Sequence, residues 1–152
     1  TSLFVSGCTH KCKGCFNEEA QDFNYGEEFT EETIETILKS IEPGYISGLS
    51  LLGGEPAEIP NQKALLPLLR QFKERFPQKN IWCYTGYTYE TDLLDKNGKA
   101  RCEATDEFLS FIDILVDGEF DQDLYDISLK FCGSSNQRLL QIQKEGSPEL
   151  VI

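Results

Sequence analysis

The sequence predicts an α/β fold in which a mostly parallel sheet forms an open partial (β/α) barrel. Short apolar runs alternate with longer segments of helical periodicity, and this alternation implies the crossover connections that make neighbouring strands parallel. Turns that contain glycine or polar residues follow the apolar runs one after another. The chain of 152 residues has too few such runs for a closed eight-stranded barrel. Residues 1–152 are therefore expected to form one domain.

The strands are expected where short apolar runs lie between turn residues. The run at residues 46–52 is typical of a buried parallel strand. The other expected strands cover residues 3–6, 80–84, 112–116 and 137–142. Cys83 lies within one of them and is expected to pack as a small buried hydrophobe. Because the carboxyl ends of parallel strands share one rim, the turns that follow the strands are expected to meet there.

The best-defined helix is expected from Thr30. Its hydroxyl can cap the helix, and Glu31 and Glu32 suit the positive amino-terminal end. Pro43 and Gly44 are expected to end it. Apolar residues recur at helical spacing and predict the core face: Ile34, Ile37, Leu38 and Ile41.

Three further helices are expected, at residues 61–76, 89–94 and 105–111. Pro67 predicts a kink in the first of them or a later start. Residues 18–29 are polar and acidic and are expected to form a connecting loop. The chain after Lys144 is expected to be a polar tail.

Composition narrows the class of protein. The formal net charge of −12 argues against a nucleic-acid partner, because phosphate binding needs clustered lysine and arginine. The apolar runs are too short to cross a membrane, and no signal peptide is visible, so we expect a cytoplasmic protein without a membrane partner. The sequence begins without methionine inside a strand-like run, which predicts that an upstream segment is missing from this numbering.

Three cysteines stand at C-x3-C-x2-C spacing directly after the first apolar run: Cys8, Cys12 and Cys15. Three thiolates on one loop can converge on one inorganic centre. A zinc ion usually takes four ligands in pairs such as C-x2-C, whereas a cubane cluster has four irons that each need a ligand. Three cysteines would leave one iron open, and an open position marks a site that binds and transforms a ligand. The alternative is a Cys3His zinc site with His10, although its place between two ligands would strain a tetrahedron.

Four further segments follow in order, with the sequences GGEP at 53–56, IWCYTGY at 81–87, VDG at 116–118 and GSSNQR at 133–138. With these motifs, the sequence from about Leu3 to Leu140 resembles the activating enzymes of the anaerobic (class III) ribonucleotide reductase. These enzymes belong to the radical S-adenosylmethionine (SAM) superfamily. The ordered set is much more specific than the cysteine motif alone, and it implies an open barrel of the radical SAM type.

The resemblance implies roles for individual residues. Cys8, Cys12 and Cys15 are expected to hold a [4Fe-4S] cluster, whose fourth iron is chelated by the amino and carboxylate groups of SAM. Contacts with SAM are expected near the adenine from Gly14 and Phe16, with Cys15 between them, near the methionyl end from Gly53, Gly54 and Glu55, and at the ribose or other polar groups from Thr85 and Asp117. For Thr85 and Asp117, a plain role as turn residues at strand ends stays open. Cys102 has no partner at metal-ligand spacing, and Cys132 stands where relatives often carry a basic residue.

The resemblance also implies an activity. A reduced cluster would cleave SAM to methionine and a 5′-deoxyadenosyl radical, which would take the Cα hydrogen of a glycine in the reductase large subunit. An electron donor such as flavodoxin is expected. Three alternatives are an activase of another glycyl radical enzyme, a small-molecule radical SAM enzyme and a zinc-binding interaction module. The small-molecule enzyme would need extra polar residues for its substrate, and the chain offers few.

Overall fold

A computed structural model describes residues 1–10, 12, 14–15, 18–142 and 149–150. Within these residues, six strands form one sheet in the order β1-β2-β3-β4-β5-β6. The first four strands pair in parallel, and the last two add to the edge in antiparallel fashion. The bounds are β1 Ser2–Val5, β2 Gly48–Gly53, β3 Asn80–Tyr84, β4 Ile114–Asp117, β5 Arg138–Gln141 and β6 Glu149–Leu150. The predicted α/β class and the mostly parallel open sheet are confirmed.

The helices lie in the connections between the parallel strands. Their bounds are α1 Glu31–Ile41, α2 Ile59–Arg75 and α3 Thr105–Ser110, with a π-helical segment at Tyr89–Leu94 and 3-10 turns at Glu18–Gln21 and Gln122–Leu124. The predicted cap of α1 is confirmed, because the Thr30 hydroxyl accepts a hydrogen bond from the Thr33 N–H. No described helix is long and apolar enough to cross a membrane.

Helix α2 differs from the prediction at its start. It begins at Ile59, so the later start that Pro67 suggested is wrong. Pro60 stands in the first turn, where a missing N–H costs nothing, and it favours an early start. Pro67 removes only one further N–H from a helix whose apolar face, with Leu69 and Phe72, is fully buried.

Two other segments are more ordered than expected. The Glu18–Gln21 turn interrupts the predicted 18–29 loop, because Ala20 is buried and its carbonyl oxygen accepts a hydrogen bond from the Gly7 N–H at 2.6 Å. The polar tail expected after Lys144 is wrong at Glu149–Leu150, which forms β6. The free edge of β5 offers unpaired backbone groups, and β6 pairs with them. Residues 143–148 and 151–152 lie outside the described residues.

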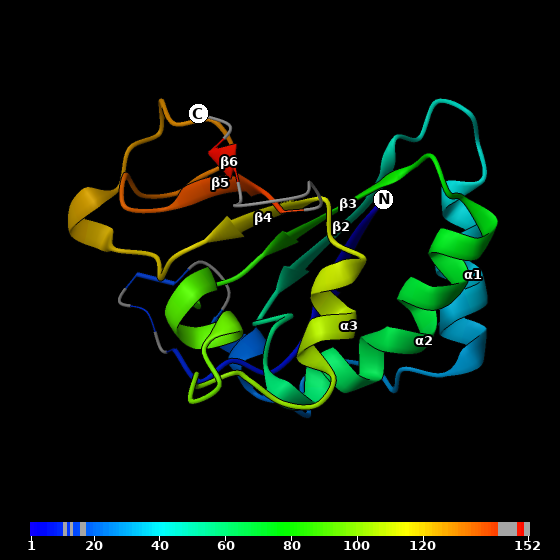
Figure 1. The fold of residues 1–152 in the computed structure, drawn as a ribbon, viewed down its shortest axis with the longest axis horizontal. Coiled ribbons are helices and arrows are strands. Elements are labelled where there is room, and N and C mark those ends of the chain that lie inside the picture. The colour runs from blue at the N-terminus through cyan, green and yellow to red at the C-terminus, as the bar shows by residue number, and fades with distance from the viewer. Residues whose placement is uncertain (11, 13, 16–17, 143–148, 151–152) are drawn as a thin grey trace.

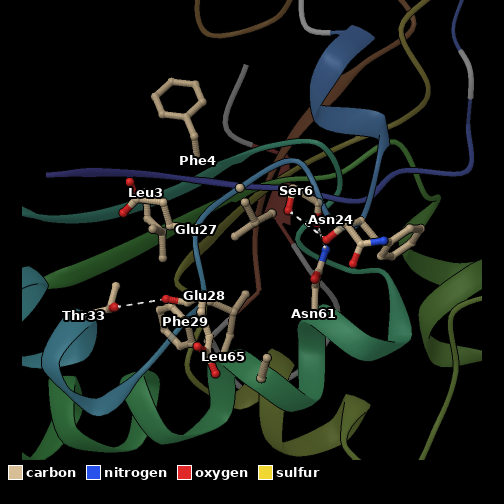
Figure 2. A pocket seen from close by; sticks show the side chains of 14 residues that line it. Leu3, Phe4, Ser6, Asn24, Glu27, Glu28, Phe29, Thr33, Asn61 and Leu65 are labelled. Carbon is tan, nitrogen blue, oxygen red and sulfur yellow. Dashed lines mark hydrogen bonds between the residues drawn. The ribbon is translucent and has the colours of Figure 1, made fainter.

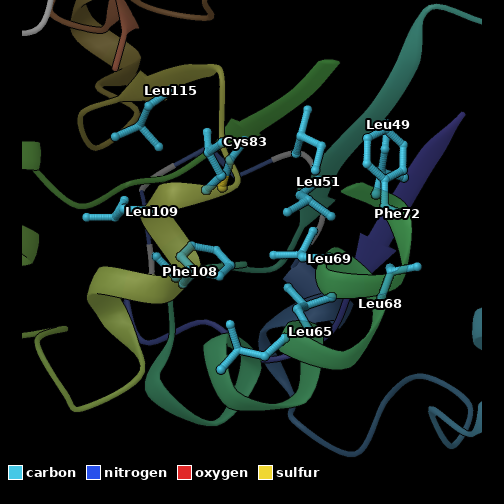
Figure 3. Packing of buried hydrophobic residues seen from close by; sticks show 14 of the residues in the cluster. Leu49, Leu51, Leu65, Leu68, Leu69, Phe72, Cys83, Phe108, Leu109 and Leu115 are labelled. Carbon is cyan, nitrogen blue, oxygen red and sulfur yellow. The ribbon is translucent and has the colours of Figure 1, made fainter. Parts of the chain in front are cut away.

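Helices α1, α2 and α3 lie together on one side of the sheet (Figure 1). The core forms between the sheet and these helices, where Leu51, Cys83 and Leu115 occupy one row across β2, β3 and β4 (Figure 3). All three side chains are fully buried, as are Phe72 of α2 and Phe108 of α3. The expected burial of Cys83 is confirmed. Because side chains alternate along a strand, the neighbours of this row point to the opposite face of the sheet.

The carboxyl ends of β1 to β4 meet at one rim, as the sequence predicted. The cysteine loop follows β1, and backbone hydrogen bonds join it to the turn after β2: Gly54 N–H donates to Val5 O, and Glu55 N–H donates to Gly7 O, both at 2.8 Å. At the next strands, Thr85 N–H donates to Val116 O at 2.9 Å. Segments that are distant in sequence are thereby held at the same edge.

Candidate functional site

A pocket of about 330 Å³ opens at this rim. All three cysteines of the motif line it, and the rest of the wall comes from the carboxyl ends of β1 to β4, the turns that follow them and the connection between β4 and β5. Its wall also includes Gly53, Gly54, Glu55 and Thr85 from the turns after β2 and β3. The structure therefore brings the predicted metal ligands and four further residues predicted to contact SAM into one cavity.

The cysteine loop is shaped by its own backbone. Cys15 N–H donates to Cys12 O at 3.1 Å, which closes a tight turn between two of the three thiols. Gly7 and Gly14 have φ values of +101° and +76°, a region that residues with a Cβ rarely adopt. The loop can therefore turn directly out of β1 and carry its cysteines to the same pocket.

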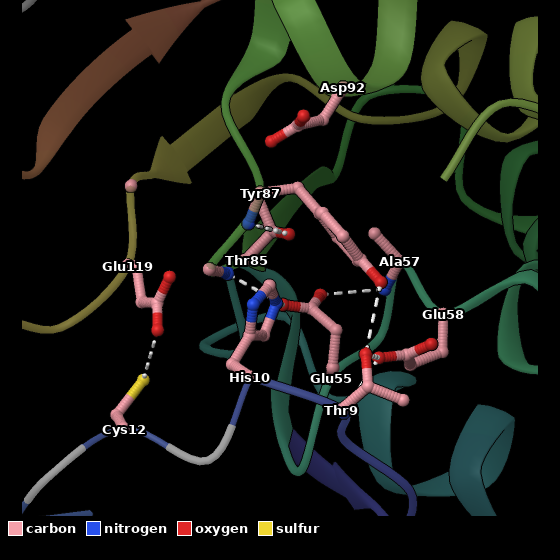
Figure 4. Close-up of polar contacts among 12 residues, drawn as sticks. Thr9, His10, Cys12, Glu55, Ala57, Glu58, Thr85, Tyr87, Asp92 and Glu119 are labelled. Carbon is pink, nitrogen blue, oxygen red and sulfur yellow. Dashed lines mark hydrogen bonds and ion pairs between the residues drawn. The ribbon is translucent and has the colours of Figure 1, made fainter. Parts of the chain in front are cut away.

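Two buried carboxylates fasten the loop between Cys8 and Cys12 (Figure 4). Glu58 Oε1 accepts hydrogen bonds from Thr9 N–H at 2.9 Å and from the Thr9 hydroxyl at 2.7 Å. Glu55 Oε1 lies 2.8 Å from His10 Nε2 and accepts a hydrogen bond from Gly86 N–H at 2.5 Å. Both glutamates belong to the connection between β2 and α2, so this connection positions the cysteine loop.

His10 helps to hold the cysteine loop in place through its contact with Glu55. Its ring packs edge-on against Tyr87, with 4.4 Å between the ring centroids. Burial disfavours the charged imidazole, but the hydrogen bond and the negative charge of Glu55 outweigh it and raise the pKa of His10. Burial raises the pKa of Tyr87 to about 12. Of this packed pair, His10 lines the pocket.

The structure offers part of a ligand set for zinc. Among the described residues, Cys8, His10 and Glu58 have ligand atoms within 4.8 Å of one another. Two of these three side chains already hold loop contacts, with Glu55 and with Thr9. The three thiols that line the pocket form a softer donor set, and thiolate sulfur is the ligand that iron–sulfur clusters take. The residues present therefore fit a cluster.

Cys12 has a distinctive environment. Its Sγ lies 3.7 Å from Glu119 Oε1, and burial together with the negative charge of Glu119 raises the pKa of this thiol to about 11 (Figure 4). The thiol is therefore protonated in the metal-free protein at neutral pH. A metal that took this sulfur as a ligand would have to displace that proton.

The glycines of the turns have a steric role. A Cβ on Gly54 would stand 2.5 Å from Ala20 O and 2.7 Å from Gly7 O, both backbone atoms of the cysteine-loop region. A Cβ on Gly86 would meet the His10 ring at 2.7 Å. These glycines let the cysteine loop approach the sheet closely, which the sequence alone did not indicate.

The other predicted SAM contacts lie in several places. Thr85 lines the pocket, and its hydroxyl accepts a hydrogen bond from Tyr87 N–H at 3.1 Å. Gly14 packs beside Gln122 and is not among the described residues of the pocket wall. Phe16 lies outside the described residues.

Asp117 is buried beside the pocket, whose described wall includes its neighbours Val116 and Gly118 but not Asp117 itself. Its carboxylate accepts hydrogen bonds from Arg138 at 2.9 and 2.5 Å and from Tyr89 N–H at 2.9 Å. The structure therefore gives Asp117 a bridging role between β4, β5 and the π-helical segment.

Sequence reasoning did not single out several wall residues: Tyr84, Phe120 and Phe131. Phe120 and Phe131 belong to the excursion between β4 and β5, and no local pattern marks them. For Tyr84, the signal was its position in the IWCYTGY segment, on the strand face that alternates with buried Cys83.

A second pocket, of about 570 Å³, lies between β1, the 23–29 segment and α2 (Figure 2). Asn61 Nδ2 donates to Ser6 O at 2.9 Å at its floor, and Glu27, Glu28 and Phe29 form its wall. None of the three motif cysteines, all of which are described, lines it. The chemistry of the site therefore belongs to the smaller pocket.

Comparison with known proteins gives matches over most of the chain. Residues 1–140 match the family model described as a 4Fe-4S single cluster domain. The chain is 41% identical to the anaerobic ribonucleoside-triphosphate reductase-activating protein of Haemophilus influenzae, over 90% of this chain and 83% of the relative. Proteins of the same description from Escherichia coli and Enterobacteria phage T4 are 39% and 36% identical, over 90% of this chain and 84% and 80% of theirs. No solved structure gives a significant match.

Proposed function

The chain belongs to the family of anaerobic ribonucleoside-triphosphate reductase-activating proteins, and from this we propose that it generates a glycyl radical in its reductase. It activates the anaerobic reductase through a 4Fe-4S domain of the radical SAM type. The observation that supports the site most directly is the convergence of Cys8, Cys12 and Cys15 on one pocket at the rim of the sheet.

Cys8, Cys12 and Cys15 would hold the [4Fe-4S] cluster and leave one iron for SAM. When bound, the cluster supplies the electron that cleaves SAM reductively and so provides the radical that takes a hydrogen atom from a reductase glycine. Glycine suits this reaction because amide groups on both sides stabilise a radical at its Cα and no side chain blocks the approach.

The chain's own residues provide a preorganised setting. Gly53, Gly54, Glu55 and Thr85 line the pocket and are proposed to contact SAM. Hydrogen bonds to His10, Gly86 N–H and Ala57 N–H hold the Glu55 carboxylate in one orientation, so this wall needs no rearrangement. Apolar side chains, among them Leu52, Val116 and Phe120, form other parts of the wall and exclude water from a reactive intermediate.

The partner is the anaerobic reductase, and we propose a one-electron donor such as flavodoxin. We also propose a reducing compartment such as the cytoplasm, which would keep the cysteines available as thiols.

The test is anaerobic reconstitution of the protein with iron and sulfide. With dithionite and SAM, the reconstituted protein should release 5′-deoxyadenosine, measured by chromatography. With the reductase added, electron paramagnetic resonance should show a glycyl radical. Release without a glycyl radical would mean a radical SAM enzyme with another substrate, and a zinc-loaded protein without release would refute the proposal.

A further inference from the structure

The face of the sheet opposite the helices carries another cavity, next to the cysteine pocket. This cavity has a volume of about 430 Å³ and runs over the amino-terminal half of β2 and the length of β3, lined by Ser50, Trp82 and Tyr84. Ser50 precedes the buried Leu51 on β2, and Trp82 and Tyr84 flank the buried Cys83 on β3. Because side chains alternate along a strand, these three side chains point away from the helices. Helices α1, α2 and α3 all lie on the other side (Figure 1).

The two cavities share two residues, Tyr84 and Phe131. The cysteine pocket has a volume at the lower end of the range for small-molecule sites, so a nucleoside-sized cofactor accounts for it. The adjoining cavity is not needed to hold that cofactor. A glycine inside a polypeptide has chain on both sides, and it can reach the cysteine pocket only if the flanking chain has a way out. The adjoining cavity provides that path.

Phe131 stands where the cavities meet and has an unusual conformation. Its φ is +63°, the one positive value among the described residues other than glycine. Its ring lies 4.9 Å from that of Trp82, yet 59% of the residue is exposed. A bulky residue in the left-handed region costs free energy, and such outliers gather at functional sites. Here the conformation holds an aromatic ring over the uncovered face.

Phe131 ends a strongly acidic part of the connection between β4 and β5, residues 119–131, which we call the 119–131 excursion. Between Glu119 and Phe131 it carries four carboxylates, those of Glu119, Asp121, Asp123 and Asp126, against the single cation Lys130. Exposed apolar residues lie among them: Leu124 is 42% exposed and Ile127 is 86% exposed. A partner surface that matches this excursion needs basic and apolar side chains together.

We propose that the 119–131 excursion and the cavity under Phe131 are the docking surface for the glycine-bearing segment of the reductase. The segment lies extended along the uncovered face, contacts Phe131, and places basic side chains beside the carboxylates of the excursion. This inference rests on the proposed function, because it specifies how that protein substrate reaches the cysteine pocket.

The test measures the dissociation constant of the complex with the whole reductase, under anaerobic conditions and at low and high salt. The charge variant is Asp121→Asn with Asp123→Asn. The introduced amide oxygen at position 121 keeps an acceptor for the backbone N–H of residue 123, which the Asp121 carboxylate now caps. Its matched control is Glu42→Gln with Glu74→Gln, which removes the same charge from the helical side.

The aromatic variant is Phe131→Ala, and its control is Tyr25→Ala, which is equally exposed at 59% and lines neither cavity.

We expect the charge variant to weaken binding about three- to tenfold at low salt, with a smaller difference at high salt. Phe131→Ala should weaken binding about tenfold or more. Both controls should bind as the unmodified protein does. Binding by both test variants that equals their controls would overturn the inference. So would a dimer of this chain that Phe131→Ala disrupts without a change in reductase binding.

Release of 5′-deoxyadenosine from SAM in the absence of the reductase is measured in parallel on the unmodified protein. This reaction tests the proposed function and needs no docking. Normal release with unaltered binding by the variants would refute only the docking surface. Absent release would refute the proposed function.

Discussion

The Glu58 carboxylate accepts two hydrogen bonds from Thr9, one from its backbone N–H and one from its hydroxyl, both through Oε1. Glu58 is 6% exposed and belongs to the turn before α2, whereas Thr9 follows the first cysteine of the motif. A buried carboxyl group on one connection thus orders the cysteine loop of another. Hydrogen bonds to charged groups are stronger than neutral ones, so this contact matters for the preorganisation of the site.

Replacing Glu58 tests this role. Glu58→Ala leaves two donors of Thr9 without their acceptor and should lower the free energy of unfolding of the metal-free protein by about 2–4 kcal/mol. It should also reduce the iron bound per chain on reconstitution. Glu58→Gln keeps one acceptor oxygen and should retain most of both properties. Chemical denaturation and iron analysis measure the two effects, and an unchanged Glu58→Ala variant would contradict the role.

The cysteines can be separated by function. Cys12→Ala should bind the cluster at least about tenfold more weakly, because losing a ligand costs no less than losing a supporting contact. Cys102→Ala is the control, because Cys102 lies near Gln62, with Sγ 3.7 Å from Gln62 Oε1, and does not line the cysteine pocket. Iron content and the visible absorption of the cluster provide the readout. Equal iron in the two variants would argue against the assigned ligand set.

Gly54 and Gly44 form a matched pair for the steric argument. Gly54→Ala places a Cβ against the backbone oxygens of Ala20 and Gly7, so we expect it to destabilise the protein by about 1–3 kcal/mol and to displace the cysteine loop. A Cβ on Gly44 meets nothing within 4 Å. Gly44→Ala should therefore leave stability nearly unchanged. Thermal unfolding of the metal-free variants measures both, and similar losses would refute close approach as the cause.

Glu90 should make a small contribution to stability that depends on pH. The hydrogen bond from Arg138 lowers the pKa of Glu90 below 4.5, although burial opposes this shift. A lowered pKa in the folded state stabilises the protein above the unfolded pKa, and the gain is lost as the pH falls through the folded pKa. Because the Glu90 side chain is 51% exposed, the effect at pH 7 should be well under 1 kcal/mol.

The measurement compares the unmodified protein with Glu90→Gln by chemical denaturation at pH 7 and at a pH below both pKa values. The difference in unfolding free energy should be present at pH 7 and absent in acid. A larger difference in unfolding free energy in acid than at pH 7 would contradict the prediction.

Local pattern was enough to predict most elements of this chain. The period of apolar residues and the cap at Thr30 predicted α1, and the alternation of strands and helices predicted the parallel sheet. The early start of α2 and the pairing of β6 were not predicted. Pro60 favours the early start of α2, and the free edge of β5 allows β6 to pair. The pairing of β6 depends on which strand lies nearby.

For the site, the sequence alone determined the three cysteines, the order of the motifs and their placement after successive parallel strands. Short-range spacing and chain direction determine these features, and both can be read along the chain. Only the tertiary structure decided which polar groups are already paired, with Glu55 held by His10 and Gly86, and Asp117 held by Arg138. It also decided that Phe131 stands over the uncovered face. These contacts join residues that are far apart in the chain, and their partners exist only once the sheet has brought the strand ends together.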